Sequence, residues 1–141
     1  MNVYAKWLVL VLRGSAVVLL TALAPVFFPY AWMQGIHRAI GLGELPAQPI
    51  VEYMARSLSA FYACHGALIL YLSFDVVRRA PVIRMLAVLG LAFGVVMVGI
   101  DLVSGLPLSW ALGEGPFIIV LGLVTLLLAR KVGAADGGAR T

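Results

Sequence analysis

The chain has 141 residues, of which 63% are hydrophobic and only 11% are charged, and its mean hydropathy is +1.07. Soluble domains carry about 25% charged residues, so this composition argues against a soluble enzyme, a secreted disulfide scaffold and a nucleic-acid-binding protein. Cys64 is the single cysteine, which rules out a disulfide within the chain. The sequence therefore predicts an integral membrane protein, in which the net charge of +4 reports topology.

Four long apolar stretches predict the membrane spans, because a helix that crosses a bilayer needs about 20 apolar residues. The spans are expected at residues 3–28, 49–77, 82–103 and 115–130. They predict an all-α, antiparallel four-helix bundle in a single domain, residues 1–132, with a flexible cytoplasmic tail at 133–141. A cleavable signal peptide is the alternative for the first stretch, because Ala22-Leu23-Ala24 resembles a cleavage site. Arg13 within the apolar stretch and Pro25 directly after the potential cut argue against cleavage.

Residues 30–48 predict a short interfacial helix and a turn between the first two spans. Trp32, Ile36 and Ile40 recur at helical spacing, and the polar residues His37 and Arg38 lie between them. The glycine- and proline-rich residues that follow favour a turn before the second span.

Lysine and arginine residues near the span ends predict the orientation, since cytoplasmic loops carry an excess of them. Arg38 and Arg56 are expected on the outer side, and both termini on the cytoplasmic side. The cytoplasmic side then holds eight of the ten cations, namely Lys6, Arg13, Arg78, Arg79, Arg84, Arg130, Lys131 and Arg140.

Small and polar residues form a stripe along the second span and another along the third, because they recur at spacings of three, four or seven positions. Gly90 and Gly94 have the spacing that lets two helices approach closely in lipid. The two stripes are therefore expected to face each other and to form the closest seam of the bundle. They comprise Glu52, Arg56, Ser59, Ala63, Gly66 and Ser73 in one span and Ala87, Gly90, Gly94 and Asp101 in the other.

Charged residues near the outer ends of the spans form a candidate polar cluster of Glu52, Arg56, Asp101 and Glu114. A charge inside a bilayer needs a partner or a use, and antiparallel packing brings Arg56 towards Asp101. The sequence predicts an ion pair between these two residues, with Glu52 as competitor or third member. Such a pair either stabilises the bundle or holds the head group of a ligand.

Arg13 and Asp75 are expected at similar depths on the cytoplasmic side. They either form a structural ion pair or extend separately to the interface. Both interpretations are structural.

His65 is expected near the bilayer midplane, with Tyr62 one turn away. An unpartnered imidazole is costly there, so His65 either forms a hydrogen bond inside the bundle or contacts a lipophilic ligand such as a quinone. Haem is disfavoured, because a site with two axial histidines needs a second histidine within the membrane, and His37 lies in the connection between the first two spans. Haem with a single axial histidine stays an alternative. No metal site or cofactor is predicted.

Several short motifs between about residues 30 and 130 carry a resemblance to a known family. They are Ile36-His37-Arg38, Gly41-Leu42-Gly43-Glu44-Leu45-Pro46, Arg56-Ser57, Tyr62, His65-Gly66 and Ser73-Phe74-Asp75. In these motifs the chain resembles a family of small bacterial four-span membrane proteins of unknown function. The resemblance implies a location in the bacterial inner membrane, but it brings no activity, cofactor or partner with it.

Three classes of function follow from these patterns. The leading hypothesis is a non-enzymatic membrane protein, either an accessory subunit of a membrane complex or a binder of a lipid-like molecule, since no catalytic motif is recognisable. The second is an enzyme acting on a lipophilic substrate, with His65 and the outer carboxylates as acid and base. The third is a small oligomeric transporter. Expected partners are the lipid bilayer and either a membrane protein or further copies of the chain, and not nucleic acid.

Overall fold

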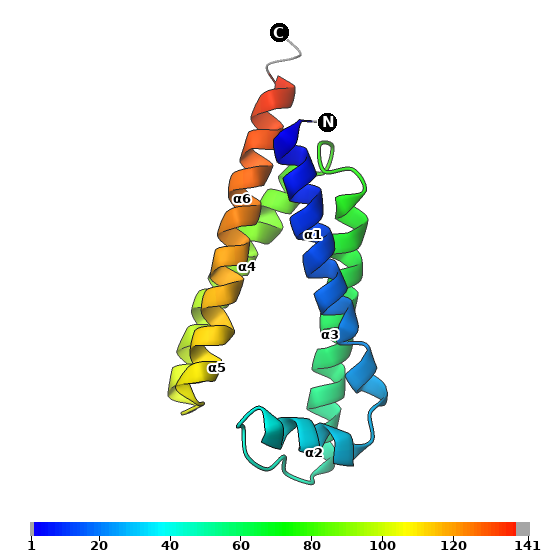
Figure 1. The fold of residues 1–141 in the computed structure, drawn as a ribbon, viewed down its shortest axis with the longest axis vertical. Helices are drawn as coiled ribbons and strands as arrows, with labels where there is room; N and C mark the ends of the chain where they lie inside the picture. Colours follow the sequence, from blue (N-terminus) through cyan, green and yellow to red (C-terminus); the bar gives the residue numbers. More distant parts are fainter. Residues whose placement is uncertain (1, 138–141) are drawn as a thin grey trace. The chain divides into compact units, whose positions relative to one another are not determined.

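The computed structural model describes residues 2–137, with side chains described for residues 2–133. These residues form helices and contain no strand, which confirms the all-α prediction. The elements are α1 (Val3–Thr21), the 3-10 turn η1 (Ala24–Phe27), α2 (Tyr30–Ala39), α3 (Pro49–Ser73), α4 (Ala80–Val103), α5 (Leu108–Gly113) and α6 (Gly115–Gly137) (Figure 1).

Three segments among the described residues are long and apolar enough to cross a membrane, namely Val3–Phe27, Ala80–Val103 and Leu108–Gly133. They support the assignment as a membrane protein. The helix α3 is equally long, at 25 residues, but it carries Glu52, Arg56 and His65 and is more polar than the other three. The predicted bundle of four spans therefore requires α3 to cross the membrane as well.

Proline and glycine residues explain where the helices end. Pro25 and Pro29 lack the N–H group that a continuing helix needs, and α1 gives way to η1 and then to α2. After α4, Gly105 adopts a φ of +67°, a conformation that L side chains rarely take. The Leu106 N–H then donates to the carbonyl oxygen of Asp101 at 3.1 Å, which closes the helix end. At the other end of the chain, α6 is helical through Gly137, beyond the predicted end of the fourth span at residue 130.

The chain forms two compact units. The first unit comprises Met1–Arg13 and Leu72–Thr141, and the second comprises Gly14–Tyr71. In the first unit α4 packs along α6, and α5 contacts both helices. Its core is built from small and branched side chains, namely Ala5, Leu8, Leu12, Leu72, Val76, Ala80, Ile83, Ala87, Ala111, Leu126, Ala129 and Val132.

Glycines set the close antiparallel approach of α4 and α6. A Cβ atom on Gly94 would lie 3.0 Å from the carbonyl oxygen of Gly115 and 2.7 Å from Cγ1 of Ile119. One on Gly122 would lie 3.2 Å from the carbonyl oxygen of Ala87. Cβ contacts this short are rare, so a larger residue at either position would require the neighbouring atoms to shift.

The second unit has its own close contact, between α3 and α1. A Cβ atom on Gly66 would lie 2.9 Å from Cβ of Leu19 and 3.1 Å from the carbonyl oxygen of Ala16. Gly66 thus faces α1, and Gly94 faces α6. The prediction that the two small-residue stripes face each other is wrong at these glycines, because each one meets the backbone of a different helix.

Candidate functional site

The guanidinium group of Arg56 lies at the junction of η1, α2 and α3. It donates hydrogen bonds to the carbonyl oxygens of Val26 at 2.8 Å and Phe28 at 3.0 Å, and to Oε2 of Glu52 at 3.3 Å. We call this arrangement the Arg56 clamp. About a third of each charged side chain remains exposed, 35% for Arg56 and 37% for Glu52.

The local backbone explains why an arginine is needed there. The segment from Pro25 to Pro29 leaves the α-helical hydrogen-bonding pattern, and the carbonyl groups of Val26 and Phe28 within it accept hydrogen bonds from Arg56. Arg56 presents several N–H donors in a rigid planar group and reaches two of these carbonyls at once. The clamp therefore ties the corner between α1 and α2 to the first turns of α3.

The loop that follows α2 is also fixed by polar contacts. Arg38 forms an ion pair with Glu44 at 2.8 Å, and Nδ1 of His37 lies 3.1 Å from the carbonyl oxygen of Gly43. Gly43 has a φ of +82°, which permits this tight return of the chain. The predicted short helix is confirmed as α2, and the loop contacts explain the charged residues that the sequence placed beside it.

Asp101 is the most unusual polar residue of the first unit. Only 1% of its surface is exposed, and its Oδ2 atom has no hydrogen-bond partner among the described residues. Gly94 lies two helical turns earlier on the same face of α4 and packs against α6, which places Asp101 on the α6 side of its helix. Arg84, near the other end of α4, lies about 25 Å away along the helix axis.

The predicted pair between Arg56 and Asp101 stays a prediction. Arg56 already donates to two carbonyl groups and to Glu52 within the second unit. Glu52 was expected as a competitor or third member, and it takes the part of a partner of Arg56 in the clamp.

Glu114, the remaining member of the candidate polar cluster, accepts a hydrogen bond from the indole N–H of Trp110 at 2.6 Å. Both residues belong to the short segment that joins α4 to α6, and Ala111 between them is buried. This contact fixes α5 at the entry to α6 and gives the Glu114 carboxylate a structural partner that the sequence pattern did not reveal.

His65 and Tyr62 lie one turn apart on α3, and both are half-buried. His65 forms no hydrogen bond with the described residues, and it is adjacent to Gly66, the point of contact with α1. Its role as a ligand contact stays a prediction. The described residues contain no cluster of three metal-binding side chains.

Arg13 and Asp75 have different partners in the first unit. Nε of Arg13 donates to Oγ of the buried Ser73 at 3.4 Å, and its guanidinium carbon lies 5.7 Å from the centre of the Phe74 ring. Asp75 accepts a hydrogen bond from the backbone N–H of Arg78 at 3.1 Å, where it caps the turn before α4. A direct ion pair between Arg13 and Asp75 stays a prediction.

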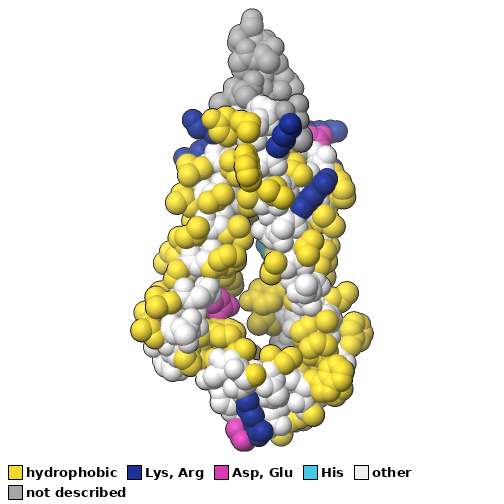
Figure 2. All heavy atoms as spheres, viewed as in Figure 1, with side chains coloured by type: hydrophobic (Ala, Val, Ile, Leu, Met, Phe, Trp, Pro, Cys, Tyr) yellow, Lys and Arg dark blue, Asp and Glu magenta, His cyan; other side chains and the backbone are white. Residues whose placement is uncertain are grey.

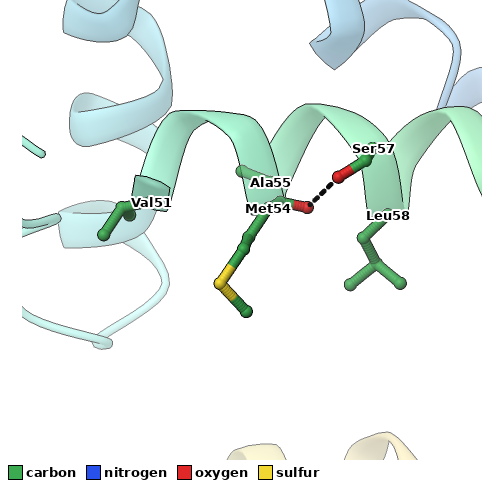
Figure 3. A pocket seen from close by; sticks show the side chains of 5 residues that line it. All are labelled: Val51, Met54, Ala55, Ser57 and Leu58. Carbon is green, nitrogen blue, oxygen red and sulfur yellow. Dashed lines mark hydrogen bonds between the residues drawn. The ribbon is translucent and has the colours of Figure 1, made fainter. Parts of the chain in front are cut away.

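A shallow groove runs along one face of α3 (Figure 3). The polar group of this groove is the Ser57 hydroxyl. It donates a hydrogen bond to the carbonyl oxygen of Met54 at 3.3 Å and is therefore bonded within its own helix. None of the predicted site residues belongs to the groove, which is lined by Val51, Met54, Ala55, Ser57 and Leu58.

Comparison of the chain with protein-family models, curated proteins and solved structures finds no match.

Proposed function

We propose that the chain is a non-enzymatic integral membrane protein, either an accessory subunit of a membrane complex or a binder of a lipid-like molecule. The Arg56 clamp carries this proposal, because it uses the arginine of the candidate polar cluster and its neighbour Glu52 in a structural contact. Glu114 is likewise bound by Trp110. An acid or base in catalysis has to reach a substrate, and these two carboxylates are engaged elsewhere.

The proposed topology has four spans, with α3 as the second. The first residues of α1 and the last turns of α6 lie at the same end of the first unit (Figure 1). Chain ends on one side of a bilayer require an even number of crossings, which supports α3 as a span beside the three apolar segments. The excess of lysine and arginine at this end favours the cytoplasmic side of a bacterial inner membrane.

Asp101 supports the ligand-binding form of the proposal. Its buried Oδ2 atom is an acceptor without a partner among the described residues, and a buried polar group is stable only when it is hydrogen-bonded. The N–H or O–H group of a lipophilic ligand would satisfy it.

Native mass spectrometry of the protein extracted from its own membranes in a mild detergent tests this proposal. We expect either a stoichiometric protein partner or a retained lipophilic molecule, and we expect the latter to be lost in Asp101→Asn or His65→Ala. The matched control is Glu44→Gln, which removes a carboxylate whose side chain is 76% exposed. A chain that carries neither a protein partner nor a lipophile would contradict both forms of the proposal.

A further inference from the structure

Cations gather at one end of the first unit, around the start of α4 (Figure 2). Arg78 lies in the turn that precedes α4, and Arg13 reaches the residue Ser73 at the end of α3. Nη1 of Arg84 lies 3.9 Å from the position of a Cβ atom on Gly133, which places it beside the end of α6. We call this cluster the basic end, and it comprises Arg13, Arg78, Arg79, Arg84, Arg130 and Lys131.

Acidic groups do not balance this charge. Asp75 is the one acidic residue at the basic end whose side chain the structure describes, and its carboxylate caps the backbone N–H of Arg78. The basic end contains six cations and this one carboxylate among the described side chains. The basic end therefore carries a surplus of positive charge among the described residues.

Exposed apolar side chains border the basic end. Phe74 is 67% exposed and lies beneath the guanidinium group of Arg13, and Val82 and Met85 are exposed on the first turns of α4. A cation beside an apolar surface suits a molecule with a negative head and a hydrocarbon tail. Free phosphate would use the charges and leave the apolar border without a partner.

We infer that the basic end binds the phosphate groups of anionic phospholipids and selects them over zwitterionic ones. The inference rests on the membrane location proposed above. Each cation near an anionic membrane surface strengthens binding by about fivefold, so several together produce a clear preference. The lipid supplies the negative charge that the described residues of this end lack.

Competitive retention of lipids by the full chain tests this inference. The purified protein is mixed with equal amounts of phosphatidylglycerol and phosphatidylcholine, and the retained lipids are counted by native mass spectrometry. We expect the wild type to prefer phosphatidylglycerol, and the triple variant Arg78→Gln, Arg84→Gln, Arg130→Gln to lower this preference by about tenfold or more.

Three controls separate lipid binding from other causes. The corresponding triple lysine variant keeps the charge and should keep the preference, and Arg38→Gln removes one cation in the second unit and should not change it. An unchanged preference in the triple glutamine variant, or an equal loss in Arg38→Gln, would overturn the inference. So would loss of the preference on addition of inorganic phosphate alone, which would identify a soluble ligand. Failure of the membrane location is seen separately, as release of the chain from membranes by alkaline carbonate.

Discussion

Replacement of Arg56 by methionine is expected to destabilise the protein by about 2–4 kcal/mol. Hydrogen bonds from charged groups contribute roughly 1.5–3 kcal/mol each, and Arg56 donates one to Val26 and one to Phe28. Their sum is reduced because 35% of the arginine side chain is exposed to solvent. The loss also leaves two carbonyl groups at the α1–α2 corner without this donor, which adds to the cost.

The matched control is Arg38→Met. Arg38 and Glu44 form a shorter ion pair, 2.8 Å, but their side chains are 55% and 76% exposed. Exposed pairs contribute about 0–1 kcal/mol, so this change should have little effect. Distance alone would rank the two arginines in the opposite order.

The assay is reversible unfolding in detergent, followed by circular dichroism, for wild type, Arg56→Met, Arg56→Lys and Arg38→Met. Arg56→Lys should fall between wild type and methionine, because an ammonium group does not present the planar set of donors that reaches both carbonyls. Equal stability of the Arg56→Met and Arg38→Met proteins would refute the reasoning.

Three further results are expected. Gly94→Ala should destabilise the protein by about 1–3 kcal/mol, since its Cβ atom would lie 2.7 Å from Cγ1 of Ile119. Gly90→Ala should be nearly neutral, because no atom lies within 4 Å of the Cβ position there. Equal effects of the two changes in an unfolding assay would exclude the α4–α6 contact. A double-mutant cycle of Arg56→Met and Asp101→Asn tests the predicted ion pair: a coupling of about 1 kcal/mol or more supports the pair, and additive effects mean that the clamp alone uses Arg56. Reporter fusions at the two ends should both be active in the cytoplasm, and opposite locations would remove α3 from the set of spans.

Composition alone indicated a helical membrane protein, because a helix that crosses a bilayer needs a long apolar stretch. Such a stretch is visible in the sequence without any knowledge of tertiary contacts. The breaks at Pro25 and Gly105 are local in the same way, since they depend on backbone chemistry at one position. The helices α2 and α6 begin at Tyr30 and Gly115, beside Pro29 and Pro116.

Partner choice was decided by tertiary structure. A stripe of small residues shows that some helix approaches closely, but it does not say which one, and Gly66 and Gly94 meet α1 and α6. The charge pattern likewise placed Arg56 among carboxylates, yet its partners include the carbonyl groups of Val26 and Phe28, and every residue carries a carbonyl group regardless of its side chain. Backbone acceptors leave no trace in the pattern of side chains, so only the folded chain reveals the Arg56 clamp.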